Sequence, residues 1–172
     1  VTGAVLGVSN VTGLVPGVTV TDATIAVDLG NAAFQSLGAG VTRNITIGYS
    51  VTDEFGASVT QTAVVTVTGV NDAPVVGGGV TDAGTEDQTV PLVVNLIQNV
   101  ADIDNGAVLS VLGGRGTGLT AGMSILGNAL SINLASAEFQ SIAEGATRDY
   151  TISYTVVDEV GASVPHTAVV TV

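Results

Sequence analysis

The feature that most constrains this chain is an internal repeat. Residues 13–67 align with residues 118–172 without a gap at an offset of 105, and 27 of the 55 aligned positions are identical. The segment TAVVTV closes both copies. Self-similarity at a fixed offset indicates that one structural plan is used more than once. We therefore expect two domains of one type, a first repeat in residues 1–70 and a second in residues 71–172.

The first copy is shorter than the second at its beginning. In the second copy, the 45 residues 73–117 precede the aligned block, whereas only the 12 residues 1–12 precede it in the first, a difference of 33. A stretch of that length corresponds to two or three strands. The sequence therefore predicts that the second repeat is complete. The first either lacks its N-terminal strands or receives them from elsewhere.

Both copies alternate apolar and polar residues over short stretches. The alternation is clearest in residues 44–51 and 149–156, and a period of two is typical of a strand with one buried face. Val and Thr, with Ser and Gly between them, suit a pleated surface. Only the stretches around Phe34 and Phe139 suggest a helical turn. Several short strands separated by turns predict an all-β chain of tandem β-sandwich repeats.

The charge balance excludes several classes of function. The chain has 15 acidic residues and three basic ones (Arg43, Arg115 and Arg148), for a net charge of −12. Binding to nucleic acid or anionic lipid needs a basic surface, and no run reaches the roughly 18 apolar residues of a membrane helix. The absence of Cys excludes disulfides and zinc–thiolate sites. The acidic excess has two interpretations, solubility or cation binding, and the clustering of the acids favours the second.

Catalytic machinery is not visible in the sequence. His166 is the only His, and its counterpart in the first copy is Gln61, so we interpret it as a strand-surface residue. No Ser-His-Asp set can be assembled with it. Paired carboxylates can cleave glycosides, but the six aromatic residues leave little for a sugar-binding platform. The chain is predicted not to be an enzyme.

Four segments in a fixed order carry a family resemblance. The linker VTGVNDAPVV (67–76) is followed by ADIDNGAVLSV (101–111), and VTDEFG (51–56) and VVDEVG (156–161) precede the closing strands. This arrangement resembles the cadherin-like and VCBS-type repeats of long bacterial adhesins, including RTX adhesins. The resemblance implies tandem Ig-like/cadherin-like β-sandwich repeats in a protein that is secreted or held on the bacterial cell surface.

The acidic residues also suggest a ligand. Ca²⁺ takes six to eight oxygen ligands from carboxylates, amides and backbone carbonyls. Asp102 and Asp104 form a D-x-D, and alternate positions in an extended loop can direct both carboxylates at one ion. The resemblance implies that Asn71 and Asp72 of the linker, and Asp158 before the last strand, complete a Ca²⁺ site at the junction of the two copies.

The same residues have a structural alternative. Asp and Asn beside Gly or Pro commonly form turns without any metal. Asp102, Asp104 and the following Asn105-Gly106 would then be only a loop. The Asp-Glu pairs at 53–54 and 158–159 would be hairpin tips.

These observations predict structural spacer repeats of a secreted adhesin or biofilm protein, with Ca²⁺ stiffening the junctions between neighbouring repeats of the same chain. The alternative is a subunit of a self-assembling extracellular filament, in which another copy donates the missing strands. A third possibility, binding of sugar or ice, would need a flat Thr-rich face. The Thr residues are explained more simply as the solvated side of the closing strands.

Overall fold

The computed structural model describes residues 5–172 of the chain. The chain divides into two compact units, unit 1 from Val1 to Asn71 and unit 2 from Asp72 to Val172. Strands contain 50% of the residues and helix 2%, so the prediction of an all-β chain is confirmed. Within the described range, no helix is long and apolar enough to cross a membrane.

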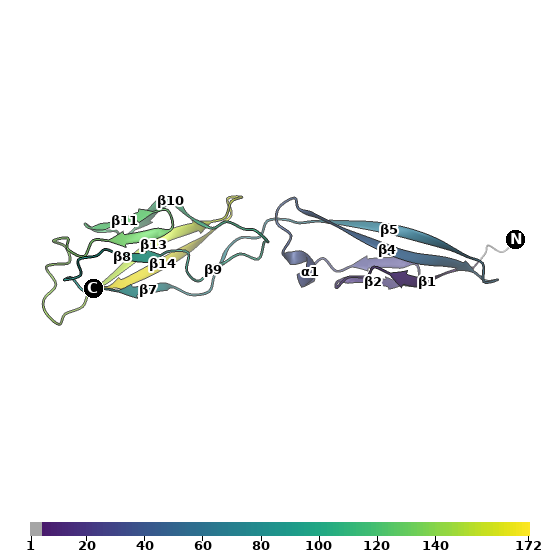
Figure 1. Ribbon diagram of the computed structural model, residues 1–172, viewed down its shortest axis with the longest axis horizontal. Helices are drawn as coiled ribbons and strands as arrows, with labels where there is room; N and C mark the ends of the chain where they lie inside the picture. Colours follow the sequence, from purple (N-terminus) through teal and green to yellow (C-terminus); the bar gives the residue numbers. More distant parts are fainter. Residues whose placement is uncertain (1–4) are drawn as a thin grey trace. The chain divides into compact units, whose positions relative to one another are not determined.

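Unit 1 is built around one long hairpin. Its elements are β1 (Leu6–Thr12), β2 (Val18–Thr21), β3 (Thr24–Val27), α1 (Ala32–Gln35), β4 (Thr42–Asp53) and β5 (Ser58–Thr68). One sheet has the order β1-β4-β5, and β2 pairs with β3 in a separate hairpin. β4 and β5 lie side by side along their whole length (Figure 1), because their antiparallel pairing is unbroken.

The core of unit 1 lies beneath this hairpin and is small. Its buried apolar residues are Val18, Phe34, Ile45, Ile47 and Val67. Phe34 reaches the core from α1, whose first turn is capped by the Asn31 side chain accepting a hydrogen bond from the Ala33 amide. The predicted helical turn at Phe34 is thus confirmed. Phe139 lies in a hydrogen-bonded turn, in which the Gln140 amide donates to the Ser136 carbonyl at 3.2 Å, but no helix is assigned there.

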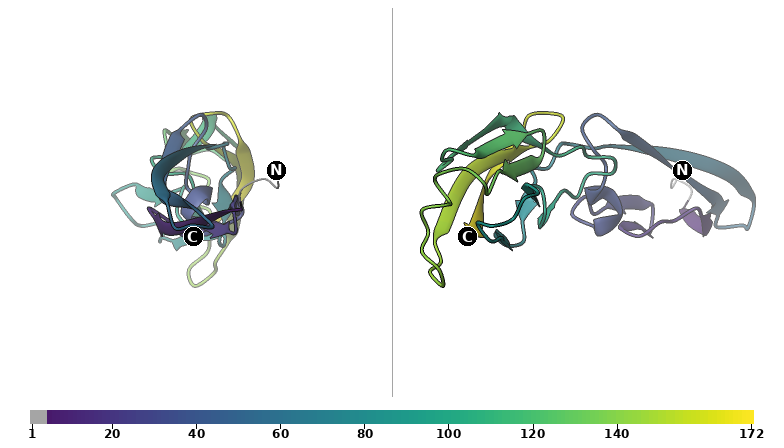
Figure 2. Two further views of the ribbon diagram at one scale, coloured as in Figure 1. Left: turned by 90° about the vertical axis from the view of Figure 1, so that its right-hand side faces the viewer. Right: turned by 60° about the vertical axis from the view of Figure 1, so that its left-hand side comes forward.

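Unit 2 has more strands. They are β6 (Val75–Val76), β7 (Val80–Ala83), β8 (Leu92–Asn95), β9 (Val100–Ala101), β10 (Ser110–Thr117), β11 (Met123–Leu126), β12 (Ala129–Ile132), β13 (Asp149–Val157) and β14 (Ser163–Thr171). One sheet has the order β10-β13-β14-β7, and a second has the order β11-β12-β8. Figure 2 shows these strands from two further sides. β7 is parallel to β14, and the other pairs are antiparallel.

The core of unit 2 fills the space between its sheets, as expected of a β-sandwich. Both sheets contribute fully buried side chains, among them Leu130 and Ile132 from β12 and Ile152 and Val156 from β13. The alternation of buried and exposed residues along β13 is the predicted one. β11 and β12 form a tight hairpin, since only the two residues Gly127 and Asn128 join them.

One prediction about unit 2 is wrong. His166 is not a surface residue of its strand but is 4% exposed. It lies on the same face of β14 as Ala168 and Val170, both fully buried. Its ring centroid lies 5.2 Å from that of Tyr154, with the two ring planes tilted by 52°. Its Nε2 is 3.2 Å from the carbonyl oxygen of Gln98. Polarity suggested a solvated position, but a hydrogen-bond partner allows burial.

Candidate cation site

The predicted ligands of unit 2 are brought together by two very short strands. β6 pairs with β9 in an antiparallel register, with Val75 opposite Ala101. Continued past the strand ends, that register places Asp72 beside Asp104. The Asp72 amide donates a hydrogen bond of 2.9 Å to Asp104 Oδ2. Residues 32 positions apart in the sequence therefore meet at one end of the sandwich.

The D-x-D segment forms a compact loop directly after β9. Asp102 Oδ1 accepts a hydrogen bond of 2.9 Å from the Asp104 amide. The Ala107 amide then donates to the Asp104 carbonyl at 3.2 Å. Gly106 lies within this turn at a φ of +87°, a conformation that glycine adopts without steric cost. The prediction that Asn105-Gly106 forms a turn is confirmed.

Two carboxylate oxygens in this loop are buried without a hydrogen-bond partner in the described structure. They are Asp102 Oδ2 and Asp104 Oδ1. The Asp104 residue as a whole is only 7% exposed. In each carboxylate, one oxygen is occupied by a backbone amide and the other is not. Buried polar atoms of this kind are uncommon in folded proteins and call for a physical explanation.

Asp158 lies on a neighbouring turn at the tip of the β13–β14 hairpin. It is 5% exposed, and its Oδ1 accepts hydrogen bonds from the amides of Val160, Gly161 and Ala162. The Oε2 of the next residue, Glu159, accepts a hydrogen bond of 2.7 Å from the Val108 amide. This contact ties the hairpin tip to the end of the D-x-D loop. The interpretation of the Asp-Glu pair as a hairpin tip is confirmed.

Hydrogen bonds join three of the five predicted ligands. The Asp72 amide donates to the Asp104 carboxylate, and the Asp104 amide donates to the Asp102 carboxylate. Asp158 is on the adjoining turn, and Asn71 is the last residue of unit 1. Across residues 5–172, no three Asp, Glu or His side chains form a group with the geometry to hold a metal ion.

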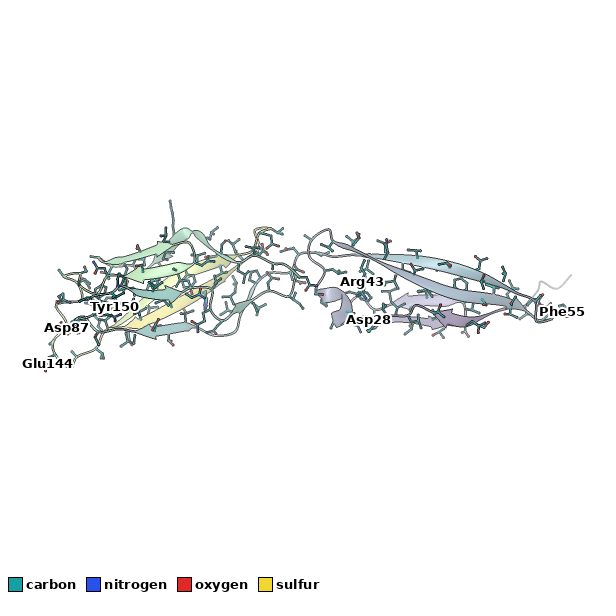
Figure 3. The ribbon with its side chains drawn as sticks, viewed as in Figure 1. Asp28, Arg43, Phe55, Asp87, Glu144 and Tyr150 are labelled. Carbon is teal, nitrogen blue, oxygen red and sulfur yellow. The ribbon has the colours of Figure 1, made fainter. Side chains whose placement is uncertain are left out.

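The hairpin tip of unit 1 repeats the same hydrogen-bonding pattern. Asp53 Oδ1 accepts from the amides of Phe55 and Ala57, and Glu54 Oε2 accepts from the amide of Val5 at 3.1 Å. Phe55 projects from this tip into solvent (Figure 3) and is 88% exposed. The structural role of the glutamates was not predicted, although the repetition of Asp-Glu at the offset of 105 was a usable signal.

Comparison with known proteins places this fold in a family. The model of the family described as "Bacterial Ig domain" matches residues 71–172, which is more than half of the chain. The chain belongs to the bacterial Ig domain family. No curated protein sequence is similar enough to be counted as a relative of this bacterial Ig domain chain.

Solved structures with a similar fold come from animal cadherins. The first two EC domains of human mucin-like protocadherin match at 16% identity with a TM-score of 0.59, covering 98% of this chain and 83% of that one. EC22-24 of mouse cadherin-23 match at 17% identity with a TM-score of 0.50, covering 97% of this chain and 53% of that one. At such identities the likeness shows the fold alone. It confirms Ig-like/cadherin-like β-sandwiches for this bacterial Ig domain chain.

Proposed function

We propose that this chain consists of spacer repeats from an extracellular bacterial adhesin of the VCBS or RTX type, and that unit 2 binds Ca²⁺ at the D-x-D loop. The duplicated sequence and the bacterial Ig fold support a mechanical role. The calcium part depends on one observation, the two buried carboxylate oxygens without hydrogen-bond partners. Secretion to the cell surface and a place in a longer array belong to the same proposal.

The physical case for a cation begins with desolvation. A buried carboxylate oxygen that lacks a compensating partner is costly, because it has given up water without replacing it. The Asp104 amide also donates to the Asp102 carboxylate, which keeps the two residues close, so their charges repel at short range. A divalent cation bound to both carboxylates would offset the desolvation of their oxygens and the repulsion between their charges. Carboxylate oxygens are the ligands that Ca²⁺ prefers.

Two carboxylate oxygens do not complete a calcium site, which needs six to eight oxygens. We propose Asp72 and Asp158 as further ligands, because one is held against Asp104 and the other lies on the adjoining turn. Backbone carbonyls and water would supply the remainder. Asn71 as a ligand, and calcium as a stiffener of repeat junctions, stay predictions from the family resemblance.

The expected consequence is that folding of unit 2 depends on calcium, because binding free energy becomes folding free energy. With free Ca²⁺ about 100-fold above its dissociation constant, unit 2 should gain about 2.7 kcal/mol. Thermal unfolding of the full chain, followed by calorimetry in calcium and in a chelator, measures this gain. An Asp102→Asn, Asp104→Asn double variant should lose it.

The variant separates the calcium site from a simple turn. Asparagine keeps the side-chain oxygen that accepts the backbone hydrogen bonds, so the loop should still fold. In chelator the variant should be at least as stable as the parent chain, because buried charge has been removed. Asp87→Asn, in the exposed loop between β7 and β8 (Figure 3), is the matched control and should keep the calcium response. Identical melting with calcium and with chelator in the parent chain would contradict the calcium site.

The alternative function, a self-assembling filament, is favoured by a different observation. β5 is an edge strand of its sheet in the described part of unit 1, and exposed edges can pair with other chains. The filament hypothesis requires a second copy of this chain as the donor. Sedimentation of the chain, together with binding of a peptide of residues 78–98, distinguishes a second copy from another repeat as the donor.

A further inference from the structure

The internal repeat indicates what covers the open side of unit 1. At an offset of 105, the counterparts of residues 72–105 would precede Val1. In unit 2 that segment supplies β7, which extends the sheet beside β14, and β8, which extends the other sheet beside β12. Both receiving strands have counterparts in unit 1, namely β5 for β14 and β3 for β12.

Both counterparts are edge strands in the described part of unit 1. β5 ends the β1-β4-β5 sheet, and β3 pairs only with β2. In unit 2, β7 covers residues 168–171 of β14 and β8 covers residues 129–132 of β12. The matching positions on unit 1 are residues 63–66 and 24–27. The two edge strands of unit 1 thus correspond to the two strands of unit 2 that pair with β7 and β8.

Side-chain burial gives the same result. Leu134 is 0% exposed, and it lies so close to Gly84 that a Cβ there would be 2.7 Å from Leu134 Cδ1. Its counterpart Leu29 is 59% exposed. Ala168 and Val170 are fully buried behind β7, whereas Ala63 and Val65 are only half-buried. Unit 1 therefore exposes the apolar residues that β7 and β8 and their connecting loop bury in unit 2.

A cavity in unit 1 is lined by the counterparts of two residues that bind Leu96 in unit 2. It has a volume of about 280 Å³ and is lined by Tyr49, Ala23, Ile25 and neighbouring residues of β1 and β4. At the offset of 105, the counterparts of Tyr49 and Ala23 are Tyr154 and Asn128, and both form hydrogen bonds with Leu96 in unit 2. The Tyr154 hydroxyl donates to the Leu96 carbonyl at 2.7 Å, and the Leu96 amide donates to the Asn128 carbonyl at 2.8 Å. Leu96 itself is 0% exposed.

We propose that unit 1 is a strand acceptor for a polypeptide segment from another repeat of the same type, supplied neither by residues 1–71 nor by a second copy of this chain. This segment has the sequence character of residues 80–96 of this chain. It adds a parallel strand along β5 and an antiparallel strand along β3, and it places a leucine in the cavity. Strand addition of this kind obtains affinity from main-chain hydrogen bonds and specificity from side-chain pockets. Unit 1 alone carries the interaction, which does not depend on calcium.

The test uses a fluorescent peptide of residues 78–98 titrated with the full chain, in calcium and in chelator. Saturable binding should appear as a rise in fluorescence anisotropy. Amide exchange should slow at residues 63–66 and 24–27 of unit 1. A Leu96→Asp peptide should fail to bind, because it would bury a charge in an apolar cavity.

A proline variant blocks the acceptor edge without disturbing the β4–β5 ladder. In unit 2 the Thr171 carbonyl accepts a hydrogen bond from the Gly84 amide, so the backbone amide and carbonyl of Thr171 point towards β7. Because these groups alternate in direction along a strand, those of Val169 point towards β7 as well. The matching position in unit 1 is Val64. Val64→Pro removes one amide from the receiving edge, and proline is tolerated on edge strands. Pro165 already occupies a position of this parity in β14.

Thr60→Pro is the matched control, because residue 60 is the counterpart of Pro165 and lies outside the stretch that β7 would cover. Val64→Pro should abolish peptide binding and Thr60→Pro should preserve it. Tyr49→Phe should weaken binding by roughly 3- to 10-fold through loss of one hydrogen bond. Absence of saturable binding, or binding unaffected by Val64→Pro, would overturn the proposal. So would sedimentation of the chain as a dimer that excludes the peptide, since a second copy would then be the occupant.

Discussion

Units 1 and 2 repeat one sequence plan but differ greatly in what they bury. Unit 2 has a core of 15 buried apolar residues, whereas the core of the described part of unit 1 has five. The closing strands of both units end in the same segment, TAVVTV. In β14 that segment is covered by β7, whereas among the described residues of unit 1 no strand pairs with the corresponding edge of β5. Strand sequence thus determines which face is apolar, but a distant segment determines whether that face is buried.

The strongest test of this comparison uses one leucine from each unit. Leu134→Ala should destabilise unit 2 by about 2–5 kcal/mol, because it removes a fully buried side chain and leaves a cavity. Leu29→Ala should change the stability of unit 1 by no more than about 0.5 kcal/mol, since exposed sites away from special features tolerate substitution. Chemical denaturation of the full chain measures both.

The two leucines are their own controls, because they occupy equivalent positions and receive the same substitution. Equal losses in the two units would break the comparison. Such a result would mean that Leu29 is covered in solution. If the strand acceptor proposal holds, Leu29→Ala should become costly only when the peptide of residues 78–98 is present.

The hairpin tips provide a second matched pair with a smaller expected effect. Asp158 is buried and holds three backbone amides, whereas Asp53 is half-buried and holds two. In chelator, Asp158→Ala should cost about 1.5–3 kcal/mol, because hydrogen bonds to a charged acceptor are lost and buried amides stay unpaired. Asp53→Ala should cost less, since water reaches the vacated amides.

Asparagine variants separate turn geometry from charge at both tips. Asp158→Asn and Asp53→Asn keep an acceptor oxygen and should recover much of each loss. Chelator removes any contribution of metal to the measurement. A larger loss at Asp53 than at Asp158 would show that burial does not set the strength of these caps.

Much of the fold was predictable because it is local or repeated. The long strands carry a period of two, and the turn after Leu126 carries Gly127 and Asn128. The parallel pairing of β7 with β14 was not predictable, since it joins residues such as Val80 and Ala168 that are far apart in the sequence. His166 was placed on the wrong face because its polarity was given more weight than its alternation with Ala168.

The candidate site was predictable in its residue types but not in its connections. The D-x-D pattern indicated a loop with Asn105-Gly106 as its turn. The hydrogen bond from Asp72 to Asp104 depends on the pairing of β6 with β9, and two-residue strands leave no readable pattern. The burial of single carboxylate oxygens depends on packing in three dimensions, so no spacing of residues could have shown it.

The smallest effect expected concerns Tyr154, whose hydroxyl donates to the buried Leu96 carbonyl. Burial raises the pKa of Tyr154 from 10.0 to about 12, because the phenolate would be desolvated. Between these values the folded state keeps a proton that the unfolded chain loses. Stability from this group is complete below pH 10 and is lost as the pH rises towards 12. At pH 11 the loss should be about 1.4 kcal/mol.

Tyr154→Phe isolates this term from every other group that titrates in alkali. The variant should be less stable than the parent at pH 8 by about 1 kcal/mol, because the Leu96 carbonyl loses its partner. As the pH rises to 11, the difference between the two chains should disappear or slightly reverse, since only the parent loses about 1.4 kcal/mol of stability through this phenol. Denaturant unfolding of unit 2 at pH 8 and pH 11 measures both differences. A gap that stays constant would show that Tyr154 titrates alike in the folded and unfolded chains, and that the Leu96 contact does not depend on a desolvated hydroxyl.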